Sequence, residues 1–261
     1  MTEAVMRGLV SKKAVPKKNI TISDKDPARA KLISKKYGVA MAESNPKAVG
    51  SADVVILAVK PQVMRIVLSE LSDKIKPGQL VISIAAGITL ASIEKYLPKV
   101  HVVRVMPNNP CLIGEGISAI CGGSLVNESD IRTAEKIFSI VGDTVRVVER
   151  YMNAVTALSG SGPAFVYEAL EAMIEGGLEA GLPKEMAKKL AEGTMLGSIK
   201  TVVKTKKSPE ELVSMVASPG GTTVAGLRML EEGNFKAAMR KAIVRASARA
   251  KEMSEEFERS L

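Results

Sequence analysis

The sequence is poor in the residues that carry several common chemistries. Its 261 residues contain one His, two Cys, four Tyr, four Phe and no Trp. A single His excludes a Ser-His-Asp triad and a metal site built from histidines. Cys111 and Cys121 have no His or Cys partner at ligand spacing, so no metal site is expected.

Long apolar runs are also missing. No run approaches the roughly 18 apolar residues that a membrane-spanning helix needs. The N-terminus has neither a signal-type apolar block nor a cleavage-site pattern. Apolar residues make up 46% and charged residues 25%, which is typical of soluble globular proteins. We therefore expect a cytoplasmic protein without a membrane partner.

The formal net charge is +9, which raises the question of nucleic-acid binding. Basic residues are scattered along helical stretches, often close to acidic ones, and the densest group is Lys204, Lys206 and Lys207. With so few aromatic side chains there is little for bases to stack on. A solvated basic surface is the favoured interpretation, with no nucleic-acid partner and an attraction for anionic ligands.

The first 150 residues alternate between strand-like and helix-like patterns. The predicted strands are Ile20–Ser23, Val54–Val59, Leu80–Ile84, Val102–Val105, Ile117–Ile120 and Val145–Val148. The predicted helices between them are Pro27–Tyr37, Gln62–Leu71, Leu90–Tyr96 and Ser129–Val141. Such alternation predicts an α/β fold with a mostly parallel, doubly wound sheet.

After Arg150 the pattern becomes entirely helical. The predicted helices are Gly162–Ala180, Pro183–Lys204, Glu210–Val216, Thr223–Glu232 and Phe235–Phe257. The stretch Ala164–Ala180 is apolar on more than one face, and a small helical unit buries such a helix best against another subunit. We predict a dinucleotide-binding domain over residues 1–149 and a helical dimerisation and substrate domain over residues 150–261.

Three turns at predicted strand ends are candidate ligand contacts, because doubly wound sheets bind ligands at the carboxyl ends of their strands. Pro61, in Ala58-Val59-Lys60-Pro61-Gln62, can take a first helical position and leave later amides for an anion. Ala85-Ala86-Gly87 lets a ligand approach the backbone closely. Arg104–Pro110 places Asn108 in a rigid loop suited to orienting a nicotinamide carboxamide or a substrate. Taken singly these signals are weak. An ordinary tight turn is the alternative for each, and for Ala58–Gln62 alone it is the favoured interpretation.

The strongest local signal is Ser218-Pro219-Gly220-Gly221-Thr222-Thr223, ahead of an apolar helical run. Both glycines permit positive φ, and amides at the start of the following helix can hold a small carboxylate or phosphate. The alternative is an N-capped loop between helices. The double glycine with the double threonine favours anion binding.

Two other features have structural explanations. Ser159-Gly160-Ser161-Gly162 resembles a nucleophile elbow, but no catalytic base is available, so close backbone crossing or support of a cradle is favoured. His101 begins an apolar strand pattern and is interpreted as a structural residue rather than a general base.

Together these motifs resemble the pyrroline-5-carboxylate reductase family. The matching stretches are Ala58–Gln62, Arg104–Pro110, Thr156–Phe165 and Val216–Leu227, and the resemblance runs along essentially the whole chain. It implies a Rossmann-type domain, an all-α C-terminal dimerisation domain with interlocking subunits, and often a ring of five dimers. It also implies reduction of Δ1-pyrroline-5-carboxylate to proline by NADPH or NADH.

The resemblance also implies site residues. Cofactor contacts fall on Ser23, Asn45, Ala58, Val59, Lys60, Pro61, Ala85, Ala86 and Gly87. Substrate contacts fall on Ser218, Gly220, Gly221, Thr222 and Thr223. Thr223 matches the family position that hydrogen-bonds the ring nitrogen and is the catalytic candidate. A protonated cyclic imine is already electrophilic, so positioning matters more than acid catalysis, which suits a chain with one His.

The resemblance departs from the family at the start of the chain. Members of the family open with a strand and a glycine turn before a helix, whereas Met1 here falls on the methionine of that turn. Residues Thr2–Leu9 are predicted to form the helix. Without a central first strand, two edges of the sheet are expected to stay unpaired.

Other functions stay open at this stage. One is a different two-domain nicotinamide reductase, such as a hydroxyacid or deazaflavin-linked enzyme; the Ser-Pro-Gly-Gly-Thr-Thr loop argues for a small cyclic amino acid instead. Another is a non-catalytic oligomerisation or regulatory subunit without cofactor binding. NADPH is expected to be preferred over NADH, because Ser23, Lys25 and Arg29 can hold a 2′-phosphate, whereas Asp24 would bind a ribose hydroxyl.

Overall fold

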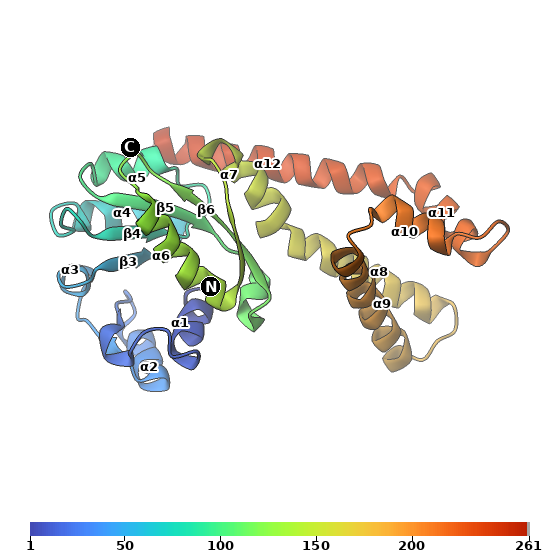
Figure 1. Cartoon of the computed structure of the whole chain (residues 1–261), viewed down its shortest axis with the longest axis horizontal. Coiled ribbons are helices and arrows are strands. Elements are labelled where there is room, and N and C mark those ends of the chain that lie inside the picture. The colour runs from blue at the N-terminus through green and yellow to red at the C-terminus, as the bar shows by residue number, and fades with distance from the viewer. Residues whose placement is uncertain (260–261) are drawn as a thin grey trace. The chain divides into compact units, whose positions relative to one another are not determined.

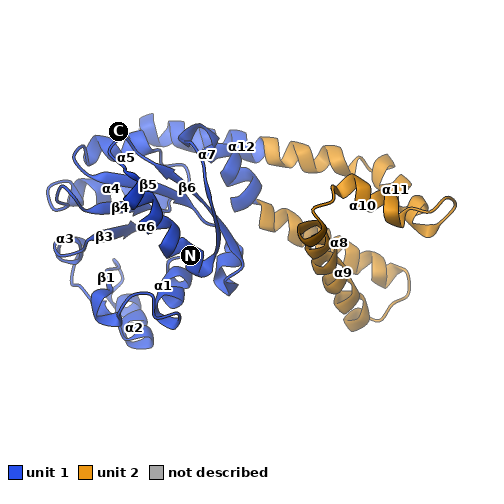
Figure 2. Cartoon of the chain, viewed as in Figure 1, with its two compact units in different colours: residues 1–161, 245–261 blue, residues 162–244 orange. Residues whose placement is uncertain are grey.

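The computed structural model describes residues 1–259, which form two compact units (Figure 2). Unit 1 comprises residues 1–161 and residues from 245 onward, and unit 2 comprises Gly162–Val244. The helices of unit 1 are α1 Thr2–Ser11, α2 Pro27–Tyr37, α3 Asn45–Val49, α4 Pro61–Leu71, α5 Leu90–Tyr96, α6 Glu128–Phe138 and α7 Met152–Val155. Its strands are β1 Thr21–Ile22, β2 Ala40–Met41, β3 Val54–Leu57, β4 Leu80–Ser83, β5 His101–Met106, β6 Gly116–Gly122 and β7 Gly142–Arg146.

A five-stranded sheet in the order β3-β4-β5-β6-β7 forms the centre of unit 1 (Figure 1). All neighbouring strands are parallel except β5 and β6, which are antiparallel. The predicted α/β fold with a mostly parallel sheet is therefore confirmed. The last strand is shifted from the predicted Val145–Val148 to Gly142–Arg146, and the short β2 and α3 were not predicted.

Two apolar clusters cover opposite faces of this sheet. Successive residues of β4 alternate between them: Val81 joins the cluster with α4 and α5, and Ile82 joins the cluster with α1 and α6. Both side chains are fully buried. A sheet covered on both faces needs apolar residues at every strand position, which explains the uninterrupted apolar runs in the sequence.

The sheet of unit 1 is interrupted between β1 and β3. Among the described residues, β1 pairs only with β2 in a separate two-stranded sheet, and β3 pairs only with β4. Each of these two strands therefore has one edge without a strand partner. This confirms the expectation that two sheet edges stay unpaired.

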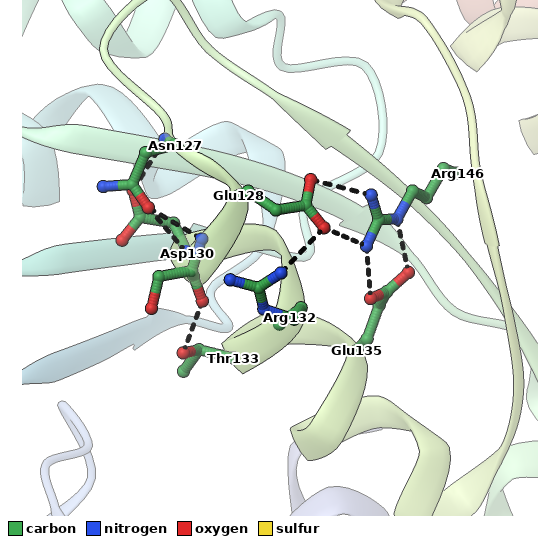
Figure 3. Close-up of polar contacts among 8 residues, drawn as sticks. Asn127, Glu128, Asp130, Arg132, Thr133, Glu135 and Arg146 are labelled. Atoms are coloured by element: carbon green, nitrogen blue, oxygen red, sulfur yellow. Dashed lines mark hydrogen bonds and ion pairs between the residues drawn. The ribbon is translucent and has the colours of Figure 1, made fainter.

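The start of α6 is fixed by polar contacts that also tie it to β7 (Figure 3). Asn127 and Asp130 form a capping box, in which each side chain accepts a hydrogen bond from the other residue's backbone amide. Arg146 of β7 forms ion pairs with Glu128 at 2.8 Å and Glu135 at 2.7 Å, both on α6. These contacts lower the pKa of both carboxyls.

Unit 2 is entirely helical. It contains α8 Gly162–Glu179, α9 Lys184–Thr205, α10 Pro209–Val216 and α11 Thr222–Glu232, and α12 Phe235–Arg259 begins in it. No residue of α8, α10 or α11 is buried in the single chain. Phe165, Ala172, Phe235 and Met239 line an apolar groove of about 300 Å³ along α8 and the first part of α12.

The two compact units divide the chain after residues 161 and 244, because the second part of α12 belongs to unit 1. The boundary between a dinucleotide-binding domain over residues 1–149 and a helical domain over residues 150–261 stays a prediction. Within residues 1–259, no helix combines the length and apolar character that crossing a membrane requires.

Candidate active site

Three of the predicted ligand turns lie at one edge of the five-stranded sheet. Strands β3, β4 and β5 are parallel neighbours, so their carboxyl ends meet at the same edge. Ala58–Pro61 follows β3, Ala85–Gly87 follows β4, and Asn108 follows β5. The tertiary structure thus brings the three turns together, although the first, at Ala58, and the last, at Asn108, are 50 residues apart in sequence.

Pro61 is the first residue of α4, as predicted from its position after an apolar strand. Its missing N–H costs nothing there, because the first helical amides have no partner within the helix. Lys60 precedes it as an exposed N-cap residue in extended conformation, and its side chain makes no capping hydrogen bond. The turn therefore offers a helix N-terminus and one ammonium group to an anionic ligand.

Gly87 has a positive φ of 74°, which explains the glycine at this turn. A Cβ at this position would lie 3.1 Å from the Cβ of Met253, on the second part of α12. Glu258, on the same helix, accepts a hydrogen bond from the Thr89 hydroxyl at 3.1 Å. Packing against α12 therefore gives a structural reason for Gly87 besides the predicted approach of a cofactor.

A carboxylate that sequence reasoning missed also contacts this turn. Glu149 Oε1 accepts hydrogen bonds from the Leu90 amide at 3.1 Å and from Arg104 Nη1 at 2.8 Å. Arg104 is only 2% exposed, with apolar residues on both sides of it in strand β5. A charged residue inside an apolar strand was the available signal, since a buried cation requires an anionic partner.

The thiol of Cys121 lies beside this pair, opposite Arg104 in the register of β5 and β6. Burial, followed by the neighbouring Glu149 carboxylate, raises the pKa of the thiol to about 12. The nucleophilic thiolate is therefore scarce at neutral pH.

The side chain of Asn108 turns into the protein. Its Oδ1 accepts a hydrogen bond from the Ile117 amide at 3.0 Å, and the residue is 8% exposed. This contact fixes the loop between β5 and β6. The predicted role of Asn108 toward a nicotinamide or a substrate stays a prediction.

Ser23 and Asn45 belong to the other sheet, because they follow β1 and β2. Asn45 begins α3, and its Nδ2 donates a hydrogen bond to Glu70 at 2.9 Å. Near Ser23, the Asp24 carboxylate accepts a hydrogen bond from the Asp26 amide and pairs with Arg29 at 3.8 Å. The structure does not place these residues on the edge of the five-stranded sheet.

The segment Thr156–Gly160 forms a π-helix, a conformation that is rare and frequent at functional sites. A Cβ at Gly160 would lie 2.6 Å from the Cε of Met106, the last residue of β5. The near atom belongs to a side chain, so the expected close backbone crossing at Gly160 stays a prediction. His101 lies at the opposite end of β5 and pairs with Asp130 at 2.7 Å, in agreement with a structural role.

In unit 2, the loop before α11 forms a tight turn. The Gly221 amide donates to the Ser218 carbonyl at 3.0 Å, and Gly220 has a φ of +72°. The expectation of positive φ holds for Gly220 but is wrong for Gly221, whose φ is −77°. Gly221 is required for space instead, since a Cβ there would lie 2.6 Å from Ser218 Oγ.

The amides that begin α11 are available to a ligand. The first helical hydrogen bond runs from the Ala225 amide to the Gly221 carbonyl, and no side chain caps the helix. Within the described residues, the amides of Thr222, Thr223 and Val224 have no acceptor. The Thr223 side chain is half-buried beside them. This arrangement can hold a small carboxylate.

Comparison with known proteins shows where this combination occurs. A family model described as pyrroline-5-carboxylate reductase dimerisation matches residues 149–253. A second, described as NADP oxidoreductase, coenzyme F420-dependent, matches residues 1–87. The pyrroline-5-carboxylate reductase of Methanosarcina acetivorans is 42% identical over 254 residues, which cover 97% of this chain and 94% of the relative. The chain belongs to the pyrroline-5-carboxylate reductase family.

Solved structures of pyrroline-5-carboxylate reductases have the same fold. The enzyme of Coxiella burnetii aligns with a TM-score of 0.89 at 35% identity, over 97% of this chain and 94% of that one. The Plasmodium falciparum enzyme, with NADP bound, aligns with a TM-score of 0.88 at 31% identity, over 96% of this chain and 93% of that one. The predicted combination of a Rossmann-type domain with a helical dimerisation domain is therefore confirmed.

The two family models cover the candidate site residues apart from Asn108, which lies outside both matches. The first 87 residues contain the turns at Ala58–Pro61 and Ala85–Gly87, and residues 149–253 contain the loop Ser218–Thr223. The dimerisation match also includes Glu149 and Met253, which both contact the turn after β4.

Proposed function

We propose that this chain reduces Δ1-pyrroline-5-carboxylate to proline with a nicotinamide cofactor as hydride donor. The loop Ser218–Thr223 carries the proposal, because its free amides and adjacent hydroxyl suit the carboxylate of a small cyclic amino acid. Family membership over 97% of the chain supports it. No nearby acid or His is required, since a protonated imine accepts hydride directly.

In this proposal the loop before α11 binds and orients the substrate. The amides of Thr222, Thr223 and Val224 donate hydrogen bonds to the carboxylate, and the tight turn at Gly220 keeps the approach open. The Thr223 hydroxyl meets the ring nitrogen, which changes from a protonated imine to a secondary amine during the reaction. Fixed donors of this kind lower the barrier because they are oriented before the substrate arrives.

The edge at the carboxyl ends of β3, β4 and β5 fits a dinucleotide in part. Ala58 and Ala86 are small and half-buried, so a ligand can approach the backbone there, and the helix start at Lys60-Pro61 suits a phosphate. When bound, the reduced nicotinamide supplies the hydride. The chain's own contribution is to hold and orient that group, for which we propose Ser23, Asn45, Val59, Gly87 and Asn108 as further contacts.

We further propose a preference for NADPH over NADH. Lys25 and Arg29 are exposed. Arg29 forms a long ion pair with Asp24, at 3.8 Å. Such an exposed pair is weak, so Arg29 can turn to a 2′-phosphate at little cost. We also propose a cytoplasmic homodimer, in a ring of five dimers, with neither nucleic acid nor membrane as partner.

The decisive experiment follows NADPH oxidation with Δ1-pyrroline-5-carboxylate and identifies proline as the product. The chain is assayed as it stands and beside a version that carries the strand and glycine turn expected of the family. NADPH and NADH are titrated side by side. We expect turnover in the extended version and tighter binding of NADPH.

The rival functions give different results in the same assay. Turnover of a hydroxyacid or a deazaflavin substrate, without turnover of the imine, would indicate another two-domain reductase. A stable oligomer without cofactor binding in either version would indicate a non-catalytic subunit. Equal or tighter binding of NADH would overturn the cofactor preference alone.

A further inference from the structure

The turn after β4 is held by a side chain that is distant in sequence. Glu149 Oε1 lies 3.1 Å from the amide of Leu90, the first residue of α5. The same oxygen lies 2.8 Å from Nη1 of Arg104 in β5. One carboxylate oxygen of Glu149 thus links Leu90, at the end of the turn, to Arg104 of the neighbouring strand β5.

The ion pair between Arg104 and Glu149 makes one hydrogen bond. A carboxylate and a guanidinium facing each other directly can form two parallel hydrogen bonds. Here only one forms, and within the described part of the chain Arg104 Nη2 is buried without a partner, while the Cys121 thiol lies beside the Glu149 carboxylate. Glu149 Oε1, which accepts the hydrogen bond from Arg104, also accepts the one from the Leu90 amide.

Both segments that adjoin unit 2 in sequence contact this turn. Glu149 lies in the segment that precedes unit 2, and Met253 and Glu258 lie in the part of α12 that follows it. Met253 packs against Gly87, and Glu258 accepts a hydrogen bond from Thr89. The Glu258 contact is exposed, whereas the Glu149 contact is partly buried, so Glu149 constrains the turn more strongly.

We propose that Glu149 is a positioning residue for cofactor binding: it holds the turn Ala85–Leu90 in the shape that accepts the nicotinamide cofactor. The proposal rests on the proposed function for the role of this turn. Glu149 acts through Leu90 and Arg104 and does not itself touch the cofactor.

The test compares Glu149→Gln with the unchanged chain by NADPH titration and by amide hydrogen exchange of residues 84–92. We expect about three- to tenfold weaker NADPH binding, because the hydrogen bond that the Leu90 amide donates is weakened when its acceptor loses its charge. Exchange should quicken at Leu90 and in the turn. In a version that turns over, KM for NADPH should rise more than kcat falls.

A double variant separates positioning from stability. Glu149→Gln leaves Arg104 buried with a weaker partner, so it also destabilises the fold. Arg104→Met combined with Glu149→Met removes both charges, and such replacements often restore stability. In this double variant the Leu90 amide has lost its acceptor altogether, so we expect the melting temperature to recover while NADPH binding and exchange stay impaired. Recovery of all three would show that the pair is merely structural and would overturn the proposal.

Glu135→Gln is the matched control. Its carboxylate is 26% exposed, against 33% for Glu149, and it too pairs with an arginine, yet its partner Arg146 lies on β7. We expect no change in NADPH binding or in exchange of residues 84–92. Unchanged exchange and binding in Glu149→Gln would also overturn the proposal. If no version binds NADPH, the proposed function fails, and hydrogen exchange still decides whether Glu149 holds the turn.

Discussion

Thr223 is the residue on which the proposed chemistry depends most directly. It is the second residue of α11, and both its amide and its half-buried hydroxyl belong to the free helix start. We expect Thr223→Ala to cost about 1–3 kcal/mol of transition-state stabilisation, because one hydrogen bond to the reacting ring is lost. The measurement is kcat/KM for Δ1-pyrroline-5-carboxylate in an active version of the enzyme. Thr222→Ser is the control and should be nearly silent, since the amide donors remain.

Gly221 sets the space available in the same loop. A Cβ introduced at this position would lie 2.6 Å from Ser218 Oγ and 3.0 Å from the Ser218 carbonyl oxygen. Because its φ is ordinary, Gly221→Val acts by crowding rather than by backbone strain. We expect loss of substrate binding with cofactor binding unchanged. An unaltered rate in Gly221→Val would place the substrate site elsewhere.

At the scale of single elements, the contacts between α6 and β7 respond to pH. Hydrogen bonds from Arg146 lower the pKa of Glu128 and Glu135 below their ordinary value of 4.5. A carboxyl whose pKa is lowered by folding stabilises the fold above that ordinary value. This contribution is lost as the pH falls through the lowered pKa.

We therefore expect Arg146→Gln to lower the melting temperature at pH 7 by about 1–3 °C, a small effect because the pairs are exposed. The difference should shrink as the pH falls below 4.5. Thermal unfolding of both proteins between pH 3 and pH 7 tests this. Arg132→Gln is the control, because Arg132 contacts Glu128 only at 3.5 Å. A difference that grows on acidification would contradict the assignment.

At the scale of the whole molecule, unit 2 exposes many large apolar side chains. Examples are Val166 at 49%, Leu196 at 58% and Val203 at 69%. Exposure of this extent on one helical unit indicates an interface, and the match to a dimerisation family model agrees with this.

We expect sedimentation at micromolar concentration to show a dimer or a larger assembly. Val166→Glu, on α8, should shift the protein toward monomer, because it places a charge in an apolar interface. Leu32→Glu is the matched control, since Leu32 is 65% exposed on α2 of unit 1. A monomer in the unchanged chain would contradict this prediction for the helical half.

The sequence by itself determined most of the elements, though not the short β2 and α3, and the most specific loop. Helices α2 and α5 have the predicted ends, and the apolar runs at β3 and β4 predicted strands covered on both faces. These predictions succeed because periodicity, capping residues and prolines act within a few residues. The motif Ser218–Thr223 was visible for the same reason, since a tight turn followed by a helix start is a local structure.

Only the tertiary structure decided which groups meet. It pairs Glu149 with Arg104 and Leu90, turns Asn108 toward Ile117, and packs Met253 on Gly87. It also gives Gly220, not Gly221, the positive φ of the loop. Contacts between residues far apart in sequence depend on how strands pair and helices pack, and no local pattern records that. The sequence of each segment determines which chemical groups it carries, whereas the fold determines which groups of other segments they contact.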